Sequence, residues 1–147
     1  MSKFIVRSAT VEDHKALVAL AKTSKYTKDF SNRMMFSSDA AYEKGWIRLA
    51  EEPDGKIIGF TCVRHKSRFP ETMLYFIVVD PEYRSQGIGE ILIKDAVQHA
   101  PTNMMRLNVM KDNTQAKKFY DRLGFTVAGV AIDGTAWSLE KEFQDVD

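Results

Sequence analysis

Apolar residues recur along this chain in short runs that predict seven strands. Residues 3–7 alternate polar and apolar side chains with β-branched members, and residues 73–79 form an almost unbroken apolar run. Alternation is typical of a strand with one buried face, and a short continuous run of a strand covered on both faces. We expect strands over residues 3–7, 46–50, 56–65, 71–79, 104–110, 125–131 and 135–140.

The segments between these strands show the longer period of helices. Thr10 offers an N-cap before an apolar stripe formed by Val11, His14, Leu17, Val18 and Ala21. Two longer helices are predicted over residues 88–100 and 113–123, where Ile88, Ile91, Leu92 and Ala96 form the apolar side of the first. Residues 24–45 predict one or two short helices, because they scatter Tyr26, Phe30, Met34, Met35, Phe36 and Tyr42 among lysines and serines.

The order of these elements predicts an α/β fold with a mixed sheet. Residues 52–55 read Glu-Pro-Asp-Gly, a turn sequence between two strands that predicts an antiparallel hairpin. Further along, the predicted strand 71–79, helix 88–100 and strand 104–110 form a strand-helix-strand unit. With 147 residues, 44% of them hydrophobic, a single domain over residues 1–147 is expected.

Residues 84–89 read Arg-Ser-Gln-Gly-Ile-Gly and lie at the junction between an apolar strand and a helix. Glycines let the backbone approach a ligand closely, and the first N–H groups of a helix have no partner within it. Such a junction is a ready site for a phosphate. Two common phosphate motifs do not fit: Glu90 follows Gly89 where a Walker loop needs Lys and Ser or Thr, and Leu92 stands where a dinucleotide fingerprint needs its third glycine.

The remaining pattern, Arg/Gln-x-x-Gly-x-Gly/Ala, resembles the acetyl-CoA signature of the GNAT superfamily of N-acetyltransferases. A second segment over residues 107–125 resembles the later strand and helix of that family, which end in Tyr-x-x-x-Gly-Phe. The matching residues are Leu107, Val109, Asn113, Ala116, Phe119, Tyr120, Leu123, Gly124 and Phe125. This resemblance implies a three-layer fold with a mixed, mostly antiparallel sheet of about six or seven strands, flanked by about four helices.

The resemblance also implies how the cosubstrate acetyl-CoA would bind. Backbone N–H groups around Arg84, Ser85, Gln86, Gly87, Ile88 and Gly89 would hold the coenzyme A pyrophosphate. In the family the fourth strand carries a bulge, and the pantetheine arm pairs with its backbone. Here that stretch includes Ile77, Val78 and Val79, and an N–H of Ile77 or Val78 would polarise the thioester carbonyl. Asn113 would contact the pantetheine arm, act as the N-cap of its helix, or do both.

Tyr120 and Glu71 are the catalytic candidates. By spacing alone, Tyr120 belongs to an apolar helical stripe and would be a core residue. The family resemblance instead implies that its hydroxyl protonates the departing thiolate, which makes it the general acid. Many relatives use a Glu on the fourth strand as the general base. Here the nearest positions are Thr72, Met73, Leu74 and Tyr75, so Glu71 is the only carboxylate on the predicted strand. Tyr75, a backbone-held water, or no dedicated base remain alternatives to Glu71.

A covalent acetyl-enzyme would need an activated thiol, and Cys62 is the only cysteine. His65 is predicted to point to the opposite face of the strand, so Cys62 is expected to be a core residue. His14 and His99 have no second ligand at metal spacing, so no metal is expected. A single cysteine and the lack of a long apolar stretch in residues 1–11 favour a cytoplasmic protein. We expect no membrane-spanning segment, because no run of about 18 apolar residues is free of charge.

The formal net charge is only +1, so we expect no nucleic acid partner on global charge. Residues 24–45 and 131–134 correspond to the acceptor side in the family. Asp39, Glu43 and Asp133 would suit an amine, whereas Lys22, Lys25 and Lys28 would favour an acidic acceptor. The sequence leaves the acceptor, a longer acyl group and a possible homodimer open. We expect an N-acetyltransferase that acts by direct attack in a ternary complex on a small-molecule or peptide amine; the alternative is a non-catalytic acyl-CoA-binding module.

Overall fold

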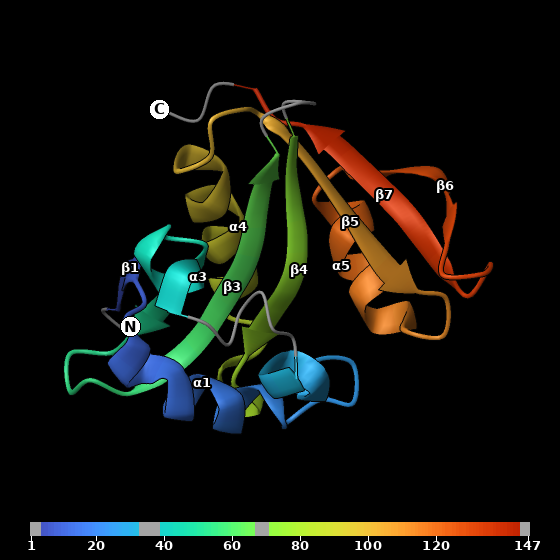
Figure 1. Ribbon diagram of the computed structural model, residues 1–147. Coiled ribbons are helices and arrows are strands. Elements are labelled where there is room, and N and C mark those ends of the chain that lie inside the picture. The colour runs from blue at the N-terminus through green and yellow to red at the C-terminus, as the bar shows by residue number, and fades with distance from the viewer. Residues whose placement is uncertain (1–3, 33–38, 67–70, 145–147) are drawn as a thin grey trace. The chain divides into compact units, whose positions relative to one another are not determined.

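The computed structural model describes residues 4–32, 39–66 and 71–144 and confirms a mixed α/β fold (Figure 1). Its seven strands are β1 (Ile5–Ser8), β2 (Ile47–Glu51), β3 (Ile57–Lys66), β4 (Glu71–Val79), β5 (Met104–Met110), β6 (Thr126–Ala131) and β7 (Ala136–Glu142). The described part of the chain also has four α-helices: α1 (His14–Ala21), α3 (Asp39–Glu43), α4 (Ile88–Gln98) and α5 (Thr114–Arg122). Short 3-10 helices are η1 (Val11–Asp13), η2 (Lys28–Asn32) and η3 (Pro81–Tyr83). Of the predicted core and lid residues, Met34, Met35 and Phe36 lie outside the described residues.

The strands hydrogen-bond in the order β1-β2-β3-β4-β5-β7-β6. The hairpin of β2 and β3 is antiparallel, as its turn sequence predicted. Strands β4 and β5 are parallel and pair over Thr72–Leu74 and Met105–Leu107, with α4 in the connection between them. The pairs β1–β2, β5–β7 and β6–β7 are antiparallel. The predicted mixed sheet is therefore confirmed.

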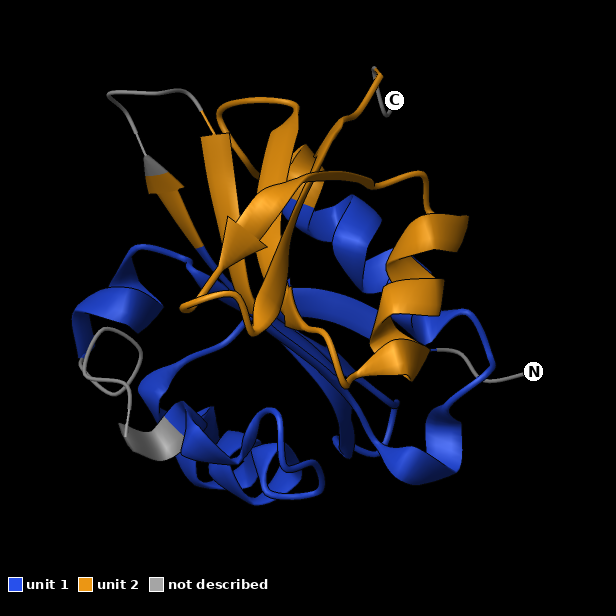
Figure 2. Ribbon diagram, turned by 90° about the vertical axis from the view of Figure 1, so that its right-hand side faces the viewer, with its two compact units in different colours: residues 1–63, 76–96 blue, residues 64–75, 97–147 orange. Residues whose placement is uncertain are grey.

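The residues form two compact units, coloured separately in Figure 2. Unit 1 comprises residues 1–63 and 76–96, and unit 2 comprises residues 64–75 and 97–147. Strands β3 and β4 each contribute residues to both units. That residues 1–147 fold as one domain stays a prediction.

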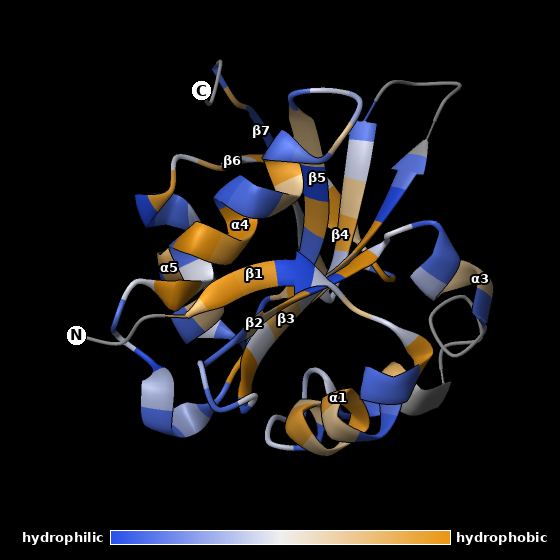
Figure 3. Ribbon diagram, turned by 90° about the vertical axis from the view of Figure 1, so that its left-hand side faces the viewer, coloured by the Kyte–Doolittle hydropathy of each residue, from blue (hydrophilic) through white to orange (hydrophobic). Residues whose placement is uncertain are grey.

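Unit 1 has apolar packing on both faces of its strands. On one face, Ile88 and Leu92 of α4 pack against Ala50 and Ile58, and all four are at most 2% exposed. On the other, the ring of Phe30 in η2 lies 5.2 Å from Phe60 and 5.7 Å from Phe76. The ribbon of α4 mixes apolar and polar residues, as expected of a helix with one apolar side (Figure 3). Two members of the predicted stripes are exceptions, since Val11 is 47% and Ile91 is 43% exposed.

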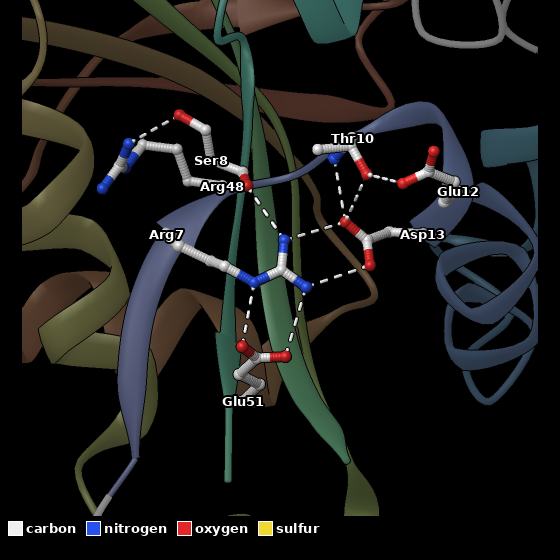
Figure 4. A network of polar contacts seen from close by, with 7 residues as sticks. All are labelled: Arg7, Ser8, Thr10, Glu12, Asp13, Arg48 and Glu51. Carbon is white, nitrogen blue, oxygen red and sulfur yellow. Dashed lines mark hydrogen bonds and ion pairs between the residues drawn. The ribbon is translucent and has the colours of Figure 1, made fainter. Parts of the chain in front are cut away.

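Two arginines fasten the strands of unit 1 to its helices. Arg7 of β1 donates to both carboxylate oxygens of Asp13 and both of Glu51, at 2.9 to 3.2 Å (Figure 4). The same Asp13 carboxylate accepts from the backbone N–H of Thr10, so the helix start predicted at Thr10 is confirmed. Arg48 of β2 donates to Asp95 of α4 at 2.6 and 3.2 Å. Because the side chains of Arg48 and Asp95 are only 14% and 12% exposed, this pair is well shielded from water.

Unit 2 combines the β5–β7–β6 strands with α5. Its buried residues include Met105, Leu107 and Val109 of β5 and Leu139 of β7. The aromatic rings of Tyr120, Phe125 and Phe143 stack edge to face in sequence, with centroids 5.4 and 5.8 Å apart. By contrast, β6 is largely exposed, and Val127 and Val130 are 49% and 58% exposed.

Candidate active site

The segment that leaves β4 in unit 1 is built to turn sharply into α4. The Asp80 side chain caps η3 by accepting from the backbone N–H of Glu82 at 2.9 Å, and Pro81 begins the turn. The Tyr83 N–H donates to the Asp80 carbonyl at 2.8 Å. The Arg84 guanidinium bonds back to the Val79 carbonyl at 3.3 Å. The start of the predicted phosphate loop is therefore held against the end of β4.

The loop adopts backbone conformations that leave it open. Ser85 and Gly87 both have positive φ angles, of 65° and 81°. Residues 84–87 are exposed, and a Cβ placed on Gly87 would meet no atom within 4 Å. Gly87 is thus required for its φ angle rather than for space inside the protein.

Helix α4 begins directly after this turn. Its first residue, Ile88, is 2% exposed and anchors the helix start in the apolar cluster of unit 1. The Ile91 N–H donates to the Gly87 carbonyl at 3.2 Å, so the amides of Ile88, Gly89 and Glu90 precede the first bonded turn. Amides at a helix start, together with the helix dipole, attract anions. This exposed loop therefore has the donor set that suits a pyrophosphate.

Gly59, which the sequence analysis did not single out, fixes the backbone of β4 beside this loop. A Cβ on Gly59 would lie 2.8 Å from the Val78 carbonyl oxygen and 3.0 Å from Cδ1 of Leu92. Only glycine allows β3, β4 and α4 to approach this closely. A lone glycine within a strand pattern is the sequence signal for such an approach.

The side chains of the predicted pantetheine strand serve packing. Val78 is buried, and Ile77 and Val79 are partly buried against the cluster formed with α4. A catalytic contribution from this stretch would have to come from its backbone. The predicted bulge in β4 stays a prediction.

In unit 2, Asn113 occupies the N-cap of α5, so the structural part of its prediction is confirmed. Its Oδ1 accepts from the Ala116 N–H at 3.3 Å. The side-chain amide group makes no hydrogen bond within residues 4–32, 39–66 and 71–144. Asn113 therefore keeps two N–H donors while its oxygen caps the helix.

Tyr120 lies on the buried side of α5 with 6% exposure. Its ring stacks edge to face on Phe119 and Phe125. Burial raises the pKa of the Tyr120 hydroxyl above its ordinary value. The hydroxyl is consequently protonated throughout the physiological range, the state required of a proton donor.

Glu71 lies at the start of β4 within an ion-pair network of unit 2. Arg106 of β5 donates to Glu71 at 3.0 Å and forms a second pair with Glu140 of β7 at 2.8 Å. Nearby, His65 bonds through Nδ1 to the hydroxyl of Thr72 at 2.9 Å, and burial lowers the pKa of His65. The ion pairs of Arg106 give Glu71 a structural role, because they join neighbouring strands. The hydrogen bond between His65 and Thr72 was not predicted from the sequence pattern.

Cys62 is fully buried, and burial raises the pKa of its thiol well above the ordinary value. A neutral buried thiol is a poor nucleophile, so the expectation that Cys62 is a core residue is confirmed. In the described part of the chain, no cluster of three or more His, Cys, Asp or Glu side chains could hold a metal ion. No described helix is long and apolar enough to cross a membrane.

The candidate acceptor carboxylates belong to both units, and each is described within its own unit. Asp39 and Glu43 line a surface cavity of about 330 Å³ in unit 1, together with Thr10 and Tyr42. Asp133 is in an exposed turn of unit 2 and has a φ angle of 53°. That any of these three carboxylates binds an amine stays a prediction.

Comparison with known proteins agrees with this geometry. The model of the acetyltransferase (GNAT) family matches residues 12–125. The chain is 52% identical over 139 residues to the 5-NmdU N-acetyltransferase of Pseudomonas phage PaMx11. This match covers 95% of this chain and 99% of the relative. The peptidyl-lysine N-acetyltransferase YjaB of Salmonella typhimurium is 43% identical over only 53 residues, 36% of this chain and 35% of that protein.

The fold is also shared with solved structures. The crystal structure of the PaiA N-acetyltransferase from Thermoplasma acidophilum in complex with coenzyme A has a TM-score of 0.77. The superposed residues cover 96% of this chain and 99% of the PaiA chain, with 21% sequence identity. The end-to-end sequence match and the family model together confirm the resemblance inferred from residues 84–89 and 107–125. The chain belongs to the acetyltransferase (GNAT) family and is an N-acetyltransferase.

Proposed function

We propose that this chain transfers the acetyl group of acetyl-CoA to the amine nitrogen of 5-NmdU, the compound in the name of its phage relative. The observation that carries this proposal is the 52% identity over 95% of the chain. A match of this extent includes most of residues 24–45, the segment that chooses the acceptor in the family. The lysine-acetylating relative matches only 36% of the chain, which supports 5-NmdU over a protein lysine.

For acetyl-CoA, the family's cosubstrate, we propose the loop at residues 84–89 as the pyrophosphate site. Its support is the exposure of residues 84–87, followed by the amides of Ile88 and Gly89 at the start of α4. Backbone groups of Ile77, Val78 and Val79 would bind the pantetheine arm, and an N–H of Ile77 or Val78 would donate to the thioester carbonyl. The free amide donors of Asn113 would complete the contacts to that arm.

The proposed reaction is a direct transfer without an acetyl-enzyme. The lone pair of the acceptor nitrogen attacks the thioester carbonyl carbon, and the carbon–sulfur bond then breaks. The nitrogen loses one proton to a base, and the departing thiolate takes one from the Tyr120 hydroxyl. The products are an N-acetylated amine and coenzyme A with a free thiol. The buried, neutral Cys62 supports this route over a covalent one.

Glu71 is retained as the proposed general base. A pair of variants distinguishes this catalytic role from a purely structural role in the ion pair with Arg106. The Glu71 carboxylate already accepts a hydrogen bond from Arg106 at 3.0 Å, and this structural contact weighs against the role. Glu71→Gln keeps the side-chain shape and removes the basic oxygen, and His65→Gln tests the neighbouring imidazole in parallel. Loss of the acidic limb of the pH–rate profile in Glu71→Gln alone supports Glu71. A lower unfolding free energy with an unchanged profile assigns Glu71 to the ion pair only.

Release of free thiol, with identification of the acetylated product, tests the proposed acceptor. The assay uses acetyl-CoA with 5-NmdU, polyamines, aminoglycosides and lysine peptides at equal concentration. We expect thiol release to depend on 5-NmdU and to yield N-acetylated 5-NmdU. A preference for another amine would refute 5-NmdU as the acceptor. If none of these amines caused thiol release, 5-NmdU would be excluded and the acceptor would be unidentified.

Two finer expectations remain proposals, and one alternative does not. A non-catalytic acyl-CoA-binding module is no longer retained, because the chain is an N-acetyltransferase. A homodimer is proposed on the exposed valines of edge strand β6 and is tested by light scattering after gel filtration. A cytoplasmic location is proposed from the sequence and is tested by cell fractionation.

A further inference from the structure

The end of helix α5 is held by a lysine from strand β7. Lys141 is half-buried, and its Nζ donates to the carbonyl of Leu123, the C-cap residue of α5. The last carbonyls of a helix have no partner within it, and the helix dipole places partial negative charge there. A lysine therefore suits this position through both its N–H groups and its charge.

This contact distinguishes Lys141 from the other lysines of the chain. Some of those lie over an aromatic ring, and others, such as Lys94 and Lys117, pair with a carboxylate on their own helix. Among the lysine side chains that the structure describes, only Lys141 donates to a backbone carbonyl. Its ammonium is therefore committed to one place inside unit 2.

Gly124 leaves the space that Lys141 occupies. A Cβ placed on Gly124 would lie 3.2 Å from Nζ of Lys141 and 3.6 Å from its Cε, so a side chain there would crowd the ammonium. Gly124 also has a φ angle of 93°, in the region that favours glycine. The glycine of the Tyr-x-x-x-Gly-Phe segment thus serves both the turn after α5 and the lysine that holds it.

Lys141 also lies at the end of a chain of contacts that leads to Tyr120. The N–H groups of Leu123 and Phe125 both donate to the Tyr120 carbonyl at 3.1 Å. The Phe125 ring packs between the rings of Tyr120 and Phe143, with centroids 5.4 and 5.8 Å away. Nζ of Lys141 lies 4.5 Å from the Phe143 ring centroid. Lys141 therefore contacts both the backbone that follows Tyr120 and the aromatic row against which its ring packs.

We infer that Lys141 is a positioning residue for Tyr120, because it fixes the end of α5 and the aromatic row. This inference rests on the proposed function, since it concerns the same proton donor. The Tyr120 hydroxyl makes no hydrogen bond within residues 4–32, 39–66 and 71–144, so its place depends on the packing of its ring and on the backbone of α5. A displacement of about 1 Å at a reacting group can lower a rate by about 100-fold.

Lys141→Met tests the inference, because it keeps most of the aliphatic chain and removes the ammonium. The control is Lys117→Met, which removes the same charge from α5 together with an ion pair to Asp121 at 2.7 Å. We expect Lys141→Met to lower kcat by about tenfold and to change KM for acetyl-CoA by less than about twofold. Lys117→Met should keep the wild-type kcat. An unaltered kcat in Lys141→Met, or an equal loss in both variants, would overturn the inference.

A double-mutant cycle with Tyr120→Phe distinguishes positioning from general support of unit 2. If Lys141 acts through the Tyr120 hydroxyl, adding Lys141→Met to Tyr120→Phe should lower kcat by less than about twofold more. A further loss of about tenfold in the double variant would mean that Lys141 supports the fold without positioning the hydroxyl, and would overturn the inference.

The same variants separate this inference from the proposed function. A loss of kcat in Tyr120→Phe with none in Lys141→Met would refute the positioning alone, whereas wild-type turnover by Tyr120→Phe would refute the proton donor and its positioning together. Urea unfolding verifies that each variant is folded under the assay conditions. Where Lys141→Met is not, Lys141→Gln, which retains N–H donors on a shorter chain, enters the same cycle with the same expected and contradicting results.

Discussion

At the scale of single residues, Gly87 tests the phosphate loop through backbone conformation alone. An alanine would fit the open space but would be strained at φ 81°, at a cost of about 1–2 kcal/mol. We expect Gly87→Ala to raise the dissociation constant for coenzyme A by about tenfold, measured by calorimetry. Gly55→Ala is the matched control, because Gly55 also has a positive φ of 92° and open space but lies in the β2–β3 turn. Equal loss of affinity in both variants would remove the loop from the cofactor site.

Tyr120 tests the proton donor. Tyr120→Phe keeps the ring contacts with Phe119 and Phe125 and removes the hydroxyl, so we expect kcat to fall by about 100-fold with little change in unfolding free energy. Because burial raises the Tyr120 pKa, the hydroxyl stays protonated, and the ratio of wild-type to variant rates should be constant between about pH 6 and pH 9.

Tyr42→Phe is the control for Tyr120→Phe. Tyr42 is also buried with a raised pKa, but its hydroxyl bonds to Nδ1 of His14 at 2.6 Å. We expect this change to lower stability by about 1 kcal/mol and to leave kcat unaltered. Wild-type turnover by Tyr120→Phe would return Tyr120 to a purely structural role.

Sequence patterns located residues better than they located interactions. The N-cap at Asn113, the core position of Cys62 and the buried side of Tyr120 followed from spacing and residue type. The partners of Glu71 did not, because Arg106 and Glu140 come from strands distant in sequence. Gly59 was missed for the same reason, since its role depends on the carbonyl of Val78 in the next strand.

At the scale of elements, Gly59 tests how closely β3, β4 and α4 must pack to form the loop and strand of unit 1. A methyl group there would press on the Val78 carbonyl at 2.8 Å, which is backbone and cannot turn away. We expect Gly59→Ala to lower the unfolding free energy by about 1–3 kcal/mol and to weaken coenzyme A binding. The measurements are urea unfolding and calorimetry.

Gly129 of β6 provides the control for Gly59, because it is also a strand glycine but would place a Cβ in open space. Gly129→Ala should be neutral or stabilise by up to about 1 kcal/mol. If Gly59→Ala were equally harmless, the close approach of β3 to β4 would not be needed for binding.

Element types were predictable because their periods are strong. The predicted strands 71–79 and 104–110 agree with β4 and β5 at both ends. The predicted helix 88–100 ends two residues early, at Gln98, and its Ile91 is exposed because helical spacing alone does not fix the width of the buried side. The register shift opposite Ala50 and Glu51 could not be predicted, since pairing across strands leaves no local pattern.

At the scale of the whole molecule, the Arg7 network predicts how stability depends on pH. The Arg7 guanidinium holds the pKa of Asp13 below its ordinary value, so this contribution is present above about pH 4 and is lost as pH falls through the folded-state pKa. We expect Asp13→Asn to lower the unfolding free energy at pH 7 by about 1–2 kcal/mol and to lose less stability than wild type on acidification. Urea unfolding between pH 7 and pH 2.5 measures both.

Glu12→Gln is the control for Asp13→Asn, because exposed Glu12 has only one side-chain hydrogen bond among the described residues, from the Thr10 hydroxyl at 3.3 Å. Its unfolding free energy should follow wild type at every pH. Parallel curves for Asp13→Asn and wild type would show that the network adds no pH-dependent stability.

The class of the molecule was predictable from two short motifs, because the loop chemistry at residues 84–89 and the segment at 107–125 are both specific. The acceptor was not, since its recognition depends on side chains from segments that are scattered along the sequence.

The central claim is that 5-NmdU is the amine that this acetyltransferase acetylates. Its most direct test is the ratio of kcat/KM for 5-NmdU to kcat/KM for a lysine peptide, measured with the same enzyme preparation and acetyl-CoA. We predict a ratio of at least about 100, the discrimination a site with matched polar contacts can provide. A ratio near or below one would contradict the account.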